Sequence, residues 1–338
     1  MSDAKPFVAI IMPALDEERF IAEAIASIVP QSDSLDYELL VVDGGSTDRT
    51  RPIVEELAAS DPRIRVIVND KKIQSAGVNI GARLADPRAR YIVRADCHVR
   101  YPEGFVARCV AGLATGEAAS VVVPMRTEGE TCLQKAIAAA QNSRLGNGGA
   151  AHRLPRRSGF VEHGHHAAFD RDTFLELGGY DESFTHNEDA EFDKRLLAAG
   201  KRIYLDVDAT VTYYPRSDLP SLARQYFRHG RGRANTILKH RAVPRLRQVL
   251  PVAMLVCLLL SLVLAVLDPI WLGFAALYVA ACIGWGGILA LQGSDPCLAL
   301  SGIAAIVMHL SWGAGFLARL VQRPPSTVAG PSAEATPG

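Results

Sequence analysis

Apolar and polar residues alternate in blocks along the first third of the chain. Short apolar runs rich in β-branched residues predict strands, and the segments between them carry apolar residues at helical spacing. The predicted strands are 7–12, 37–42, 64–68 and 91–95, and the predicted helices are 17–29, 47–59 and 75–84. Strands that alternate with helices build a parallel sheet covered on both faces, so the pattern predicts an α/β fold.

The pattern changes after Arg247. Three apolar runs, at 248–267, 270–292 and about 298–318, carry almost no charge, and each is close to the roughly 20 residues that cross a bilayer. Buried helices of a soluble protein explain three such runs in succession poorly. We therefore predict a cytoplasmic domain over 1–245, a membrane region with two or three hydrophobic helices over 246–322, and a disordered tail over 323–338.

Basic residues give this membrane region an orientation. The segment before it is strongly basic, which places that segment on the cytoplasmic side or against anionic headgroups. Its basic residues are Arg224, Arg228, Arg231, Arg233, Lys239, Arg241, Arg245 and Arg247. Three full spans would put Arg319 and Arg323 on the opposite side, against the positive-inside rule. A re-entrant or interfacial course for one of the runs would remove this conflict.

The overall composition narrows the choice of partners. The chain has 338 residues, of which 49% are hydrophobic, and its 36 basic residues balance 36 acidic ones, so no net charge attracts nucleic acid. The six cysteines show no paired spacing, and we expect no disulfide framework. Residues 1–7 lack the features of a secretory signal, so we expect the domain to lie in the cytoplasm at the cell inner membrane.

Carboxylates follow three of the predicted strands. Glu17 comes after the first strand, Asp43 after the second and Asp96 after the fourth. Ligands of parallel α/β sheets bind beyond the carboxyl ends of the strands, which makes these residues candidates for a binding site. The first turn has no GxGxxG sequence, which argues against a dinucleotide-dependent oxidoreductase. Asp43, in the run LLVVDGGSTD, is equally well explained by a tight turn and by a nucleotide-binding carboxylate.

Several of these segments together resemble the nucleotide-binding half of family-2 glycosyltransferases. The likeness rests on PALDEERFIAEAIASI, on VVDGGSTDRT and on a D-x-H after a strand, and it covers about residues 7–240. The chain departs mildly from the family at Asp16, where Asn is usual, and at Gly44, where the family has a second Asp. The resemblance implies a GT-A fold, a UDP-sugar donor and these donor-binding residues: Pro13, Glu17, Asp43, Lys72, Gln74 and Asp96.

Asp96 and His98 stand where this family has its DxD metal motif. The departing nucleoside diphosphate gathers negative charge, which Mg²⁺ or Mn²⁺ can neutralise through phosphate oxygens. The imidazole of His98 suits Mn²⁺ better than Mg²⁺, so we favour Mn²⁺ and keep both. Read without the family, His98 is an ordinary polar residue near a strand end.

An acidic pair, Glu188 and Asp189, opens a predicted helix in the second half of the chain. A helix dipole by itself favours acidic residues at this place. The resemblance implies that Asp189 is the general base that takes the proton of the acceptor hydroxyl, and that Glu188 orients the base or the acceptor.

The run QYFRHGRGR resembles a degenerate QxxRW motif, with Gln225 and Arg228 matched and His229 in place of Trp. Together with Arg231 these residues are expected to bind the acceptor or a diphosphate, while the same segment also fits a basic amphipathic helix on a membrane. His165 belongs to a polar cluster expected to line the donor or acceptor pocket. The adjacent His165 and His166 should point to opposite sides of an extended segment, which argues against a closed zinc site.

The combined motifs are most similar to those of succinoglycan-type exopolysaccharide glucosyltransferases. This likeness implies an inverting transfer of a sugar, with glucose from UDP-glucose favoured, onto a polyprenyl-diphosphate-linked saccharide at the membrane. A non-catalytic membrane scaffold of a polysaccharide assembly complex and a polyprenyl-phosphate sugar transferase are the alternatives. Joint retention of Asp43, Asp96 and Asp189 argues against the first, and the match at Gln225 and Arg228 argues against the second.

Overall fold

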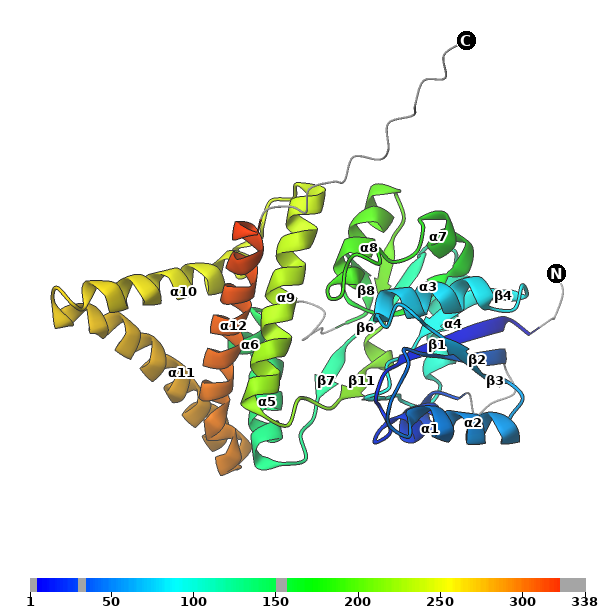
Figure 1. Ribbon diagram of the computed structural model, residues 1–338, viewed down its shortest axis with the longest axis horizontal. Coiled ribbons are helices and arrows are strands. Elements are labelled where there is room, and N and C mark those ends of the chain that lie inside the picture. The colour runs from blue at the N-terminus through cyan, green and yellow to red at the C-terminus, as the bar shows by residue number, and fades with distance from the viewer. Residues whose placement is uncertain (1–4, 30–34, 150–156, 323–338) are drawn as a thin grey trace, which may run out of the picture.

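The computed structural model describes residues 5–29, 35–149 and 157–322. An α/β unit forms one side of the molecule, a pair of long helices runs beside it, and an apolar helical hairpin extends away on the other side (Figure 1). The predicted tail at 323–338 lies outside the described residues.

A mostly parallel sheet forms the centre of the α/β unit. Its strand order is β3-β2-β1-β4-β9-β6-β10-β8. Strands β1 to β4 and the pair β6 and β10 run parallel, whereas β9 is antiparallel to both of its neighbours. The bounds are β1 (Phe7–Ala14), β2 (Asp36–Asp43), β3 (Ile64–Val68), β4 (Ala89–Arg94), β6 (Ser120–Val123), β8 (Gly159–Val161), β9 (His165–Asp170) and β10 (Ile203–Leu205).

A second, three-stranded sheet lies beside the first and has the order β5-β11-β7. It consists of β5 (Val99–Arg100), β7 (Met125–Thr127) and β11 (Val211–Tyr213).

Helices cover both faces of the large sheet, as predicted. One face packs against α1 (Ile21–Ile28), α2 (Thr50–Ser60) and α4 (Phe105–Ala114), and the other against α3 (Gln74–Leu84), α7 (Arg171–Glu176) and α8 (Glu188–Ala198). Alternate residues of β1 enter the two cores, with Ile10 on the first face and Ile11 on the second. Both are fully buried, which is why the strand is an unbroken apolar run.

The first helix begins at Ile21, four residues later than the hydrophobic spacing predicts. The backbone N–H groups of Glu17 and Glu18 donate to Thr50 Oγ1 at 2.7 Å and to Asp48 Oδ2 at 3.0 Å. Because side chains of the neighbouring loop satisfy these donors, the residues after β1 stay in a turn at the sheet edge.

Two long helices, α9 (Leu219–His240) and α12 (Ser301–Val321), lie against each other beside the α/β unit (Figure 1). Their backbones approach closely at two glycines. A Cβ atom at Gly230 would lie 2.0 Å from the carbonyl oxygen of Trp312, and one at Gly315 would lie 1.9 Å from that of Phe227. Only glycine fits at these two positions.

Within the described residues, three helical segments are long and apolar enough to cross a membrane: Leu246–Leu264, Pro269–Gly293 and Pro296–Val321. The first two form a hairpin of α10 (Leu246–Leu264) and α11 (Leu272–Gly293) whose large apolar side chains are mostly exposed. The third contains α12, which is partly buried against α9. Arg319 near the end of α12 donates to Asn235 of α9. These apolar helices suggest an association with a membrane.

One sequence expectation is wrong. Cys132, at the start of α5 (Cys132–Asn142), forms a disulfide with Cys297 in the short helix η3 (Pro296–Leu300) that precedes α12. The partners are 165 residues apart in the sequence. No local spacing pattern can reveal such a pair, because only the packing of α5 against η3 brings the two thiols together.

Candidate active site

A cavity of about 1330 Å³ lies between the α/β unit and the helices α9 to α12. Polar side chains from the strand ends and from α3, α8 and α9 line one part of it, and apolar side chains from α10, α11 and α12 line another. The polar lining includes Gln74, Asp96, His98, His165, Glu188, Asp189, Gln225 and Arg228, and the apolar lining includes Leu246, Leu250, Pro251, Met254, Ala281, Met308 and Trp312.

Asp43 ends β2, is buried and does not line the cavity. Its Oδ1 accepts from the backbone N–H of Ser46 at 3.0 Å and from the hydroxyl of Ser46 at 2.6 Å. Asp16 in the preceding loop accepts from the N–H of Thr47 at 2.7 Å. The carboxylate of Asp43 therefore holds the glycine turn after β2, and that turn is tied to the loop after β1.

Lys72 and Pro13 lie at the same sheet edge. The side chain of Lys72 passes over the turn, since a Cβ atom at Gly45 would lie 3.6 Å from its Nζ. Gly45 has φ +82°, which suits glycine. The carbonyl of Pro13 accepts from the thiol of Cys97 at 3.3 Å. Like Asp43, neither Pro13 nor Lys72 lines the cavity, whereas the predicted donor residues Gln74 and Asp96 do.

Asp96 follows β4 and is buried among polar groups. Its Oδ1 accepts from Gln74 Nε2 at 2.7 Å and from Arg94 Nη2 at 3.1 Å. His165 Nε2 lies 3.5 Å from Oδ2. Burial by itself would raise the pKa of Asp96, but the guanidinium of Arg94 outweighs burial and holds the pKa below its usual value. The group is therefore an ionised carboxylate facing the cavity.

His98 lies beside Asp96 in the cavity lining, and its Nδ1 is 3.4 Å from Glu17 Oε1. A carboxylate and an imidazole can both ligate Mn²⁺ or Mg²⁺. Within the part of the chain that the structure describes, no group of three or more His, Cys, Asp or Glu side chains could hold a metal ion. Asp96 and His98 would therefore supply at most two ligands of such an ion, and the others would have to come from a bound diphosphate.

Glu188 and Asp189 form the first turn of α8. Asn187 precedes them with φ +66°, and its Nδ2 donates to the carbonyl of His229 in α9 at 3.1 Å, which ties the start of α8 to α9. Burial, reinforced by the neighbouring charge of Asp189, raises the pKa of Glu188 to about 7. Glu188 is buried, whereas Asp189 is partly exposed in the cavity.

A buried cluster lies one helical turn beyond Asp189. Asp193 Oδ2 lies 2.6 Å from His163 Nδ1, and Asp193 Oδ1 lies 2.7 Å from His166 Nε2. Burial alone would raise the pKa of Asp189, but His163, His166 and two arginines outweigh it and hold the pKa well below its usual range. His165 and His166 point to opposite sides of their strand, as expected, with His165 toward Asp96.

The predicted residues of α9 separate into two places. Gln225 and Arg228 line the cavity, and Gln225 Nε2 donates to the hydroxyl of Tyr213 at 3.0 Å. Arg231 lies outside the cavity lining, is exposed, and donates to Gln322 Oε1 at 3.1 Å. Arg233, the last arginine of the same run, lines the cavity.

Arg94 and Asp193 belong to the site but are not part of any recognised sequence motif. Arg94 is an arginine in a buried strand two residues before Asp96, and this spacing places both side chains on one face of the strand. Asp193 stands four residues after Asp189, on the same face of α8. Both spacings can be read from the sequence. The same spacings are also common on protein surfaces and in cores that have no binding or catalytic role.

Comparisons with known proteins agree with this geometry. The family model described as Glycosyl transferase family 2 matches residues 9–178. The chain is 45% identical to the succinoglycan biosynthesis protein ExoA of Rhizobium meliloti (strain 1021), over 92% of this chain and 94% of that protein. A second relative is the dolichyl N-acetyl-alpha-D-glucosaminyl phosphate 3-beta-D-2,3-diacetamido-2,3-dideoxy-beta-D-glucuronosyltransferase of Methanococcus voltae, 22% identical over 69% of this chain and 74% of that protein.

Among solved structures, the mannosyltransferase PcManGT from Pyrobaculum calidifontis, in complex with GDP-Man and Mn²⁺, has a TM-score of 0.59 to this chain. The match covers 94% of this chain and 88% of that one at 19% identity. At this identity the likeness concerns the fold alone, and it confirms the predicted GT-A-like arrangement.

Proposed function

The chain belongs to glycosyl transferase family 2, and from that premise we propose that it is an inverting hexosyltransferase of exopolysaccharide biosynthesis. It transfers a sugar from a UDP-sugar, with UDP-glucose as the favoured donor, onto a polyprenyl-diphosphate-linked saccharide. The likeness to a protein named for succinoglycan biosynthesis supports the pathway class. The name of the Methanococcus voltae relative, which specifies a dolichyl-linked sugar, supports a lipid-linked acceptor.

One observation carries this proposal above the others. A single cavity is lined both by the carboxylates of Asp96 and Asp189 and by the apolar helices α10 and α11. A water-soluble acceptor has no need of an apolar wall formed by helices that are long enough to cross a membrane. An acceptor with a sugar at one end and an isoprenoid chain at the other matches both parts of the lining.

The reaction that this site supports is a single displacement. The acceptor hydroxyl attacks the anomeric carbon, the bond from that carbon to the diphosphate oxygen breaks, and Asp189 takes the hydroxyl proton. The lowered pKa of Asp189 keeps its carboxylate in the ionised form, which a general base needs, over the physiological pH range. Because one displacement inverts the anomeric centre, an α-linked donor sugar becomes β-linked in the product.

Residues at the strand ends would hold the donor. Pro13, Asp43 and Lys72 surround the edge where the uridine and diphosphate would lie, and Gln74 would fix the carboxylate of Asp96. A divalent ion, Mn²⁺ or Mg²⁺, held by Asp96 and His98 together with phosphate oxygens, would neutralise the charge that collects on the departing diphosphate.

We further propose a division of the chain into a cytoplasmic catalytic domain over 1–245 and an inner-membrane region over 246–322. The hairpin of α10 and α11 enters the bilayer, while α12 stays beside α9 at the membrane surface. The contact between Arg319 and Asn235 supports this arrangement, because it keeps the end of α12 next to the catalytic domain. The arrangement also leaves Arg319 on the cytoplasmic side, in agreement with the positive-inside rule.

The test is transfer of radiolabel from UDP-glucose into extracted lipid by membranes that contain the protein, with Mn²⁺ or with a chelator. We expect labelling that needs the metal ion, is lost in Asp189→Asn, and persists in Asp172→Asn, an exposed first-turn residue of α7. Label on a lipid with a single sugar would instead indicate a polyprenyl-phosphate sugar transferase. An α-linked product would contradict inversion, and absence of label with every nucleotide sugar would indicate a non-catalytic scaffold.

A further inference from the structure

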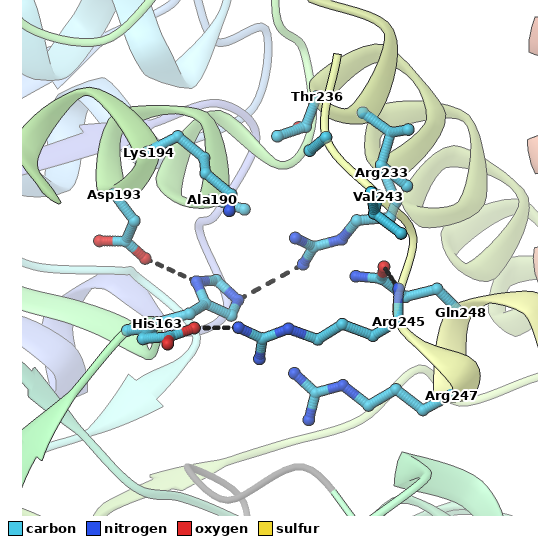
Figure 2. Close-up of a pocket in the computed structure, with 13 residues that line it drawn as sticks. His163, Ala190, Asp193, Lys194, Arg233, Thr236, Val243, Arg245, Arg247 and Gln248 are labelled. Carbon is cyan, nitrogen blue, oxygen red and sulfur yellow. Dashed lines mark hydrogen bonds and ion pairs between the residues drawn. The ribbon is translucent and has the colours of Figure 1, made fainter. Parts of the chain in front are cut away.

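Three arginines gather at the junction of α9 and α10, away from the strand-end carboxylates. Arg233, Arg245 and Arg247 line a small pocket of about 50 Å³, and all three also line the large cavity. Figure 2 shows their guanidinium groups along one wall of the small pocket, pointing in the same direction toward His163 and its strand. The junction thus presents three parallel cationic groups to one space.

These cationic groups exceed the anionic groups around them. Asp193, the nearest buried carboxylate, is engaged by both His163 and His166. Glu162 pairs with Arg245, and both side chains of that pair are at least half exposed. Within the described ranges Arg247 has no hydrogen bond or ion pair, although its side chain is partly buried in the pocket wall.

Arg233 shows the effect of this imbalance. Burial lowers the pKa of its guanidinium, and the charges of Arg247 and Arg245 lower it further against the opposing effect of Asp189. Partly buried cations that repel one another are unfavourable unless an anion joins them. The arrangement is therefore that of a binding site for an anion, and guanidinium groups bind phosphate oxygens in pairs.

The position of the three arginines limits which phosphate group they can bind. Neither Asp96 nor His98 lines the small pocket, so the cluster is separate from the edge where the donor diphosphate would lie. Arg247 stands in the first turn of α10, and the next two turns of that helix add Leu250 and Met254 to the cavity wall. An anion held here has an apolar surface on one side and the partly exposed carboxylate of Asp189 on the other.

We propose that Arg233, Arg245 and Arg247 bind the diphosphate of the lipid-linked acceptor. The inference rests on the proposed function and adds to it a location for the acceptor head group. The isoprenoid chain lies along Leu250, Pro251 and Met254 of α10, and the saccharide reaches from the diphosphate toward Asp189. The exposed partner of Arg245, Glu162, is displaced when the diphosphate binds.

Binding of farnesyl diphosphate, a short prenyl diphosphate, to the full chain in nanodiscs of neutral phosphatidylcholine tests this proposal. We expect Arg247→Ala and Arg245→Ala to weaken binding by on the order of tenfold or more, as the loss of one charge-assisted contact predicts. Arg241→Asn is the matched control. It removes a positive charge from the same junction, outside both cavities, and Asn tolerates the positive φ of 47° at this position.

Further probes separate the sources of phosphate. UDP should bind equally to wild type and to both pocket variants, and the uncharged alcohol farnesol should bind weakly to all of them. Equal affinity of wild type and Arg247→Ala for farnesyl diphosphate would overturn the proposal. So would inorganic pyrophosphate binding as tightly as farnesyl diphosphate, or displacement of the probe by phosphatidylglycerol vesicles, because the cluster would then serve a free anion or bulk lipid.

This measurement does not require sugar transfer. If the chain were a scaffold, farnesyl diphosphate binding could still depend on Arg247 while no sugar is transferred. If the chain transfers sugar but binds the probe independently of Arg247, the reaction stands and the placement of the diphosphate fails. The Asp189→Asn variant, which should lose transfer and keep probe binding, connects the two experiments.

Discussion

The Nδ1 atom of His163 lies 2.6 Å from Oδ2 of Asp193, one turn of α8 after Asp189. The second oxygen of Asp193 is 2.7 Å from His166 Nε2, so a single buried carboxylate orients two imidazoles. Those imidazoles are the largest source of the positive field that lowers the pKa of Asp189. In the proposed reaction Asp193 would therefore act through the histidines, as a positioning residue.

Asp193→Asn should lower kcat by about tenfold or more and leave the KM for the UDP-sugar unchanged, since the amide can orient the imidazoles only through one oxygen. The measurement is steady-state transfer at saturating acceptor, next to a thermal unfolding curve. Asp172→Asn is the control, because it makes the same substitution in a helix that lies outside the cluster. A fall in kcat that merely follows the loss of folded protein would contradict a positioning role.

Glu188→Gln should become more stable relative to wild type as the pH rises. The pKa of Glu188 is about 7 in the folded protein against an ordinary value of 4.5, so the folded state holds a proton that the unfolded state releases between these values. The stabilisation from this proton is complete below the ordinary pKa and is lost as the pH rises through 7. Glutamine resembles the protonated form of Glu188, so the Glu188→Gln variant does not lose this stabilisation as the pH rises.

Thermal unfolding in a chelator at pH 5.5 and pH 8.5 measures this effect. We expect the midpoint of Glu188→Gln relative to wild type to be higher at the upper pH than at the lower pH, by on the order of a few degrees. The exposed first-turn residue Glu23 of α1 supplies the control variant, Glu23→Gln. A constant difference between Glu188→Gln and wild type across this range would show that Glu188 is ionised throughout.

Arg94→Met should destabilise the protein strongly, because it leaves the carboxylate of Asp96 buried without its main cation. Removal of one partner of a buried ion pair typically costs about 3–5 kcal/mol. The double variant Arg94→Met with Asp96→Asn should recover part of this stability and remain inactive, since Asp96 lines the cavity and is a proposed donor-binding residue. Denaturant or thermal unfolding of both single variants and the double variant gives the coupling energy, and additive effects would contradict a direct pair.

Gly315→Ala should separate α9 from α12. Its Cβ atom would lie 1.9 Å from the carbonyl oxygen of Phe227, which is backbone and cannot rotate away. We expect a loss of about 1–3 kcal/mol or more and reduced transfer, because residues of both helices line the cavity. Gly284→Ala on α11 is the matched control, since a Cβ atom there meets open space. Equal thermal stability of the two variants would show that the close approach is unimportant.

The amino-acid sequence alone determined the fold class and the chemistry of the strand ends. Both faces of the sheet are covered, so its first strands carry short, nearly continuous apolar runs, and the strand predicted at 64–68 coincides with β3 (Ile64–Val68). Residues 17–20, predicted as the start of a helix, form a turn instead, because side chains of a neighbouring loop hold them there. Local motifs also identified Asp96, His98 and Asp189 as candidate site residues, and these three residues line one cavity.

Only the tertiary structure decided the features that depend on contacts between distant segments. Arg231 and Arg233 look equivalent in the sequence, but two residues turn a helix by about 200°, so one faces away from the cavity and the other lines it. The disulfide between Cys132 and Cys297 and the seating of α12 on α9 arise in the same way. Hydrophobic spacing reports which face of a segment is buried, and packing alone determines what that face meets.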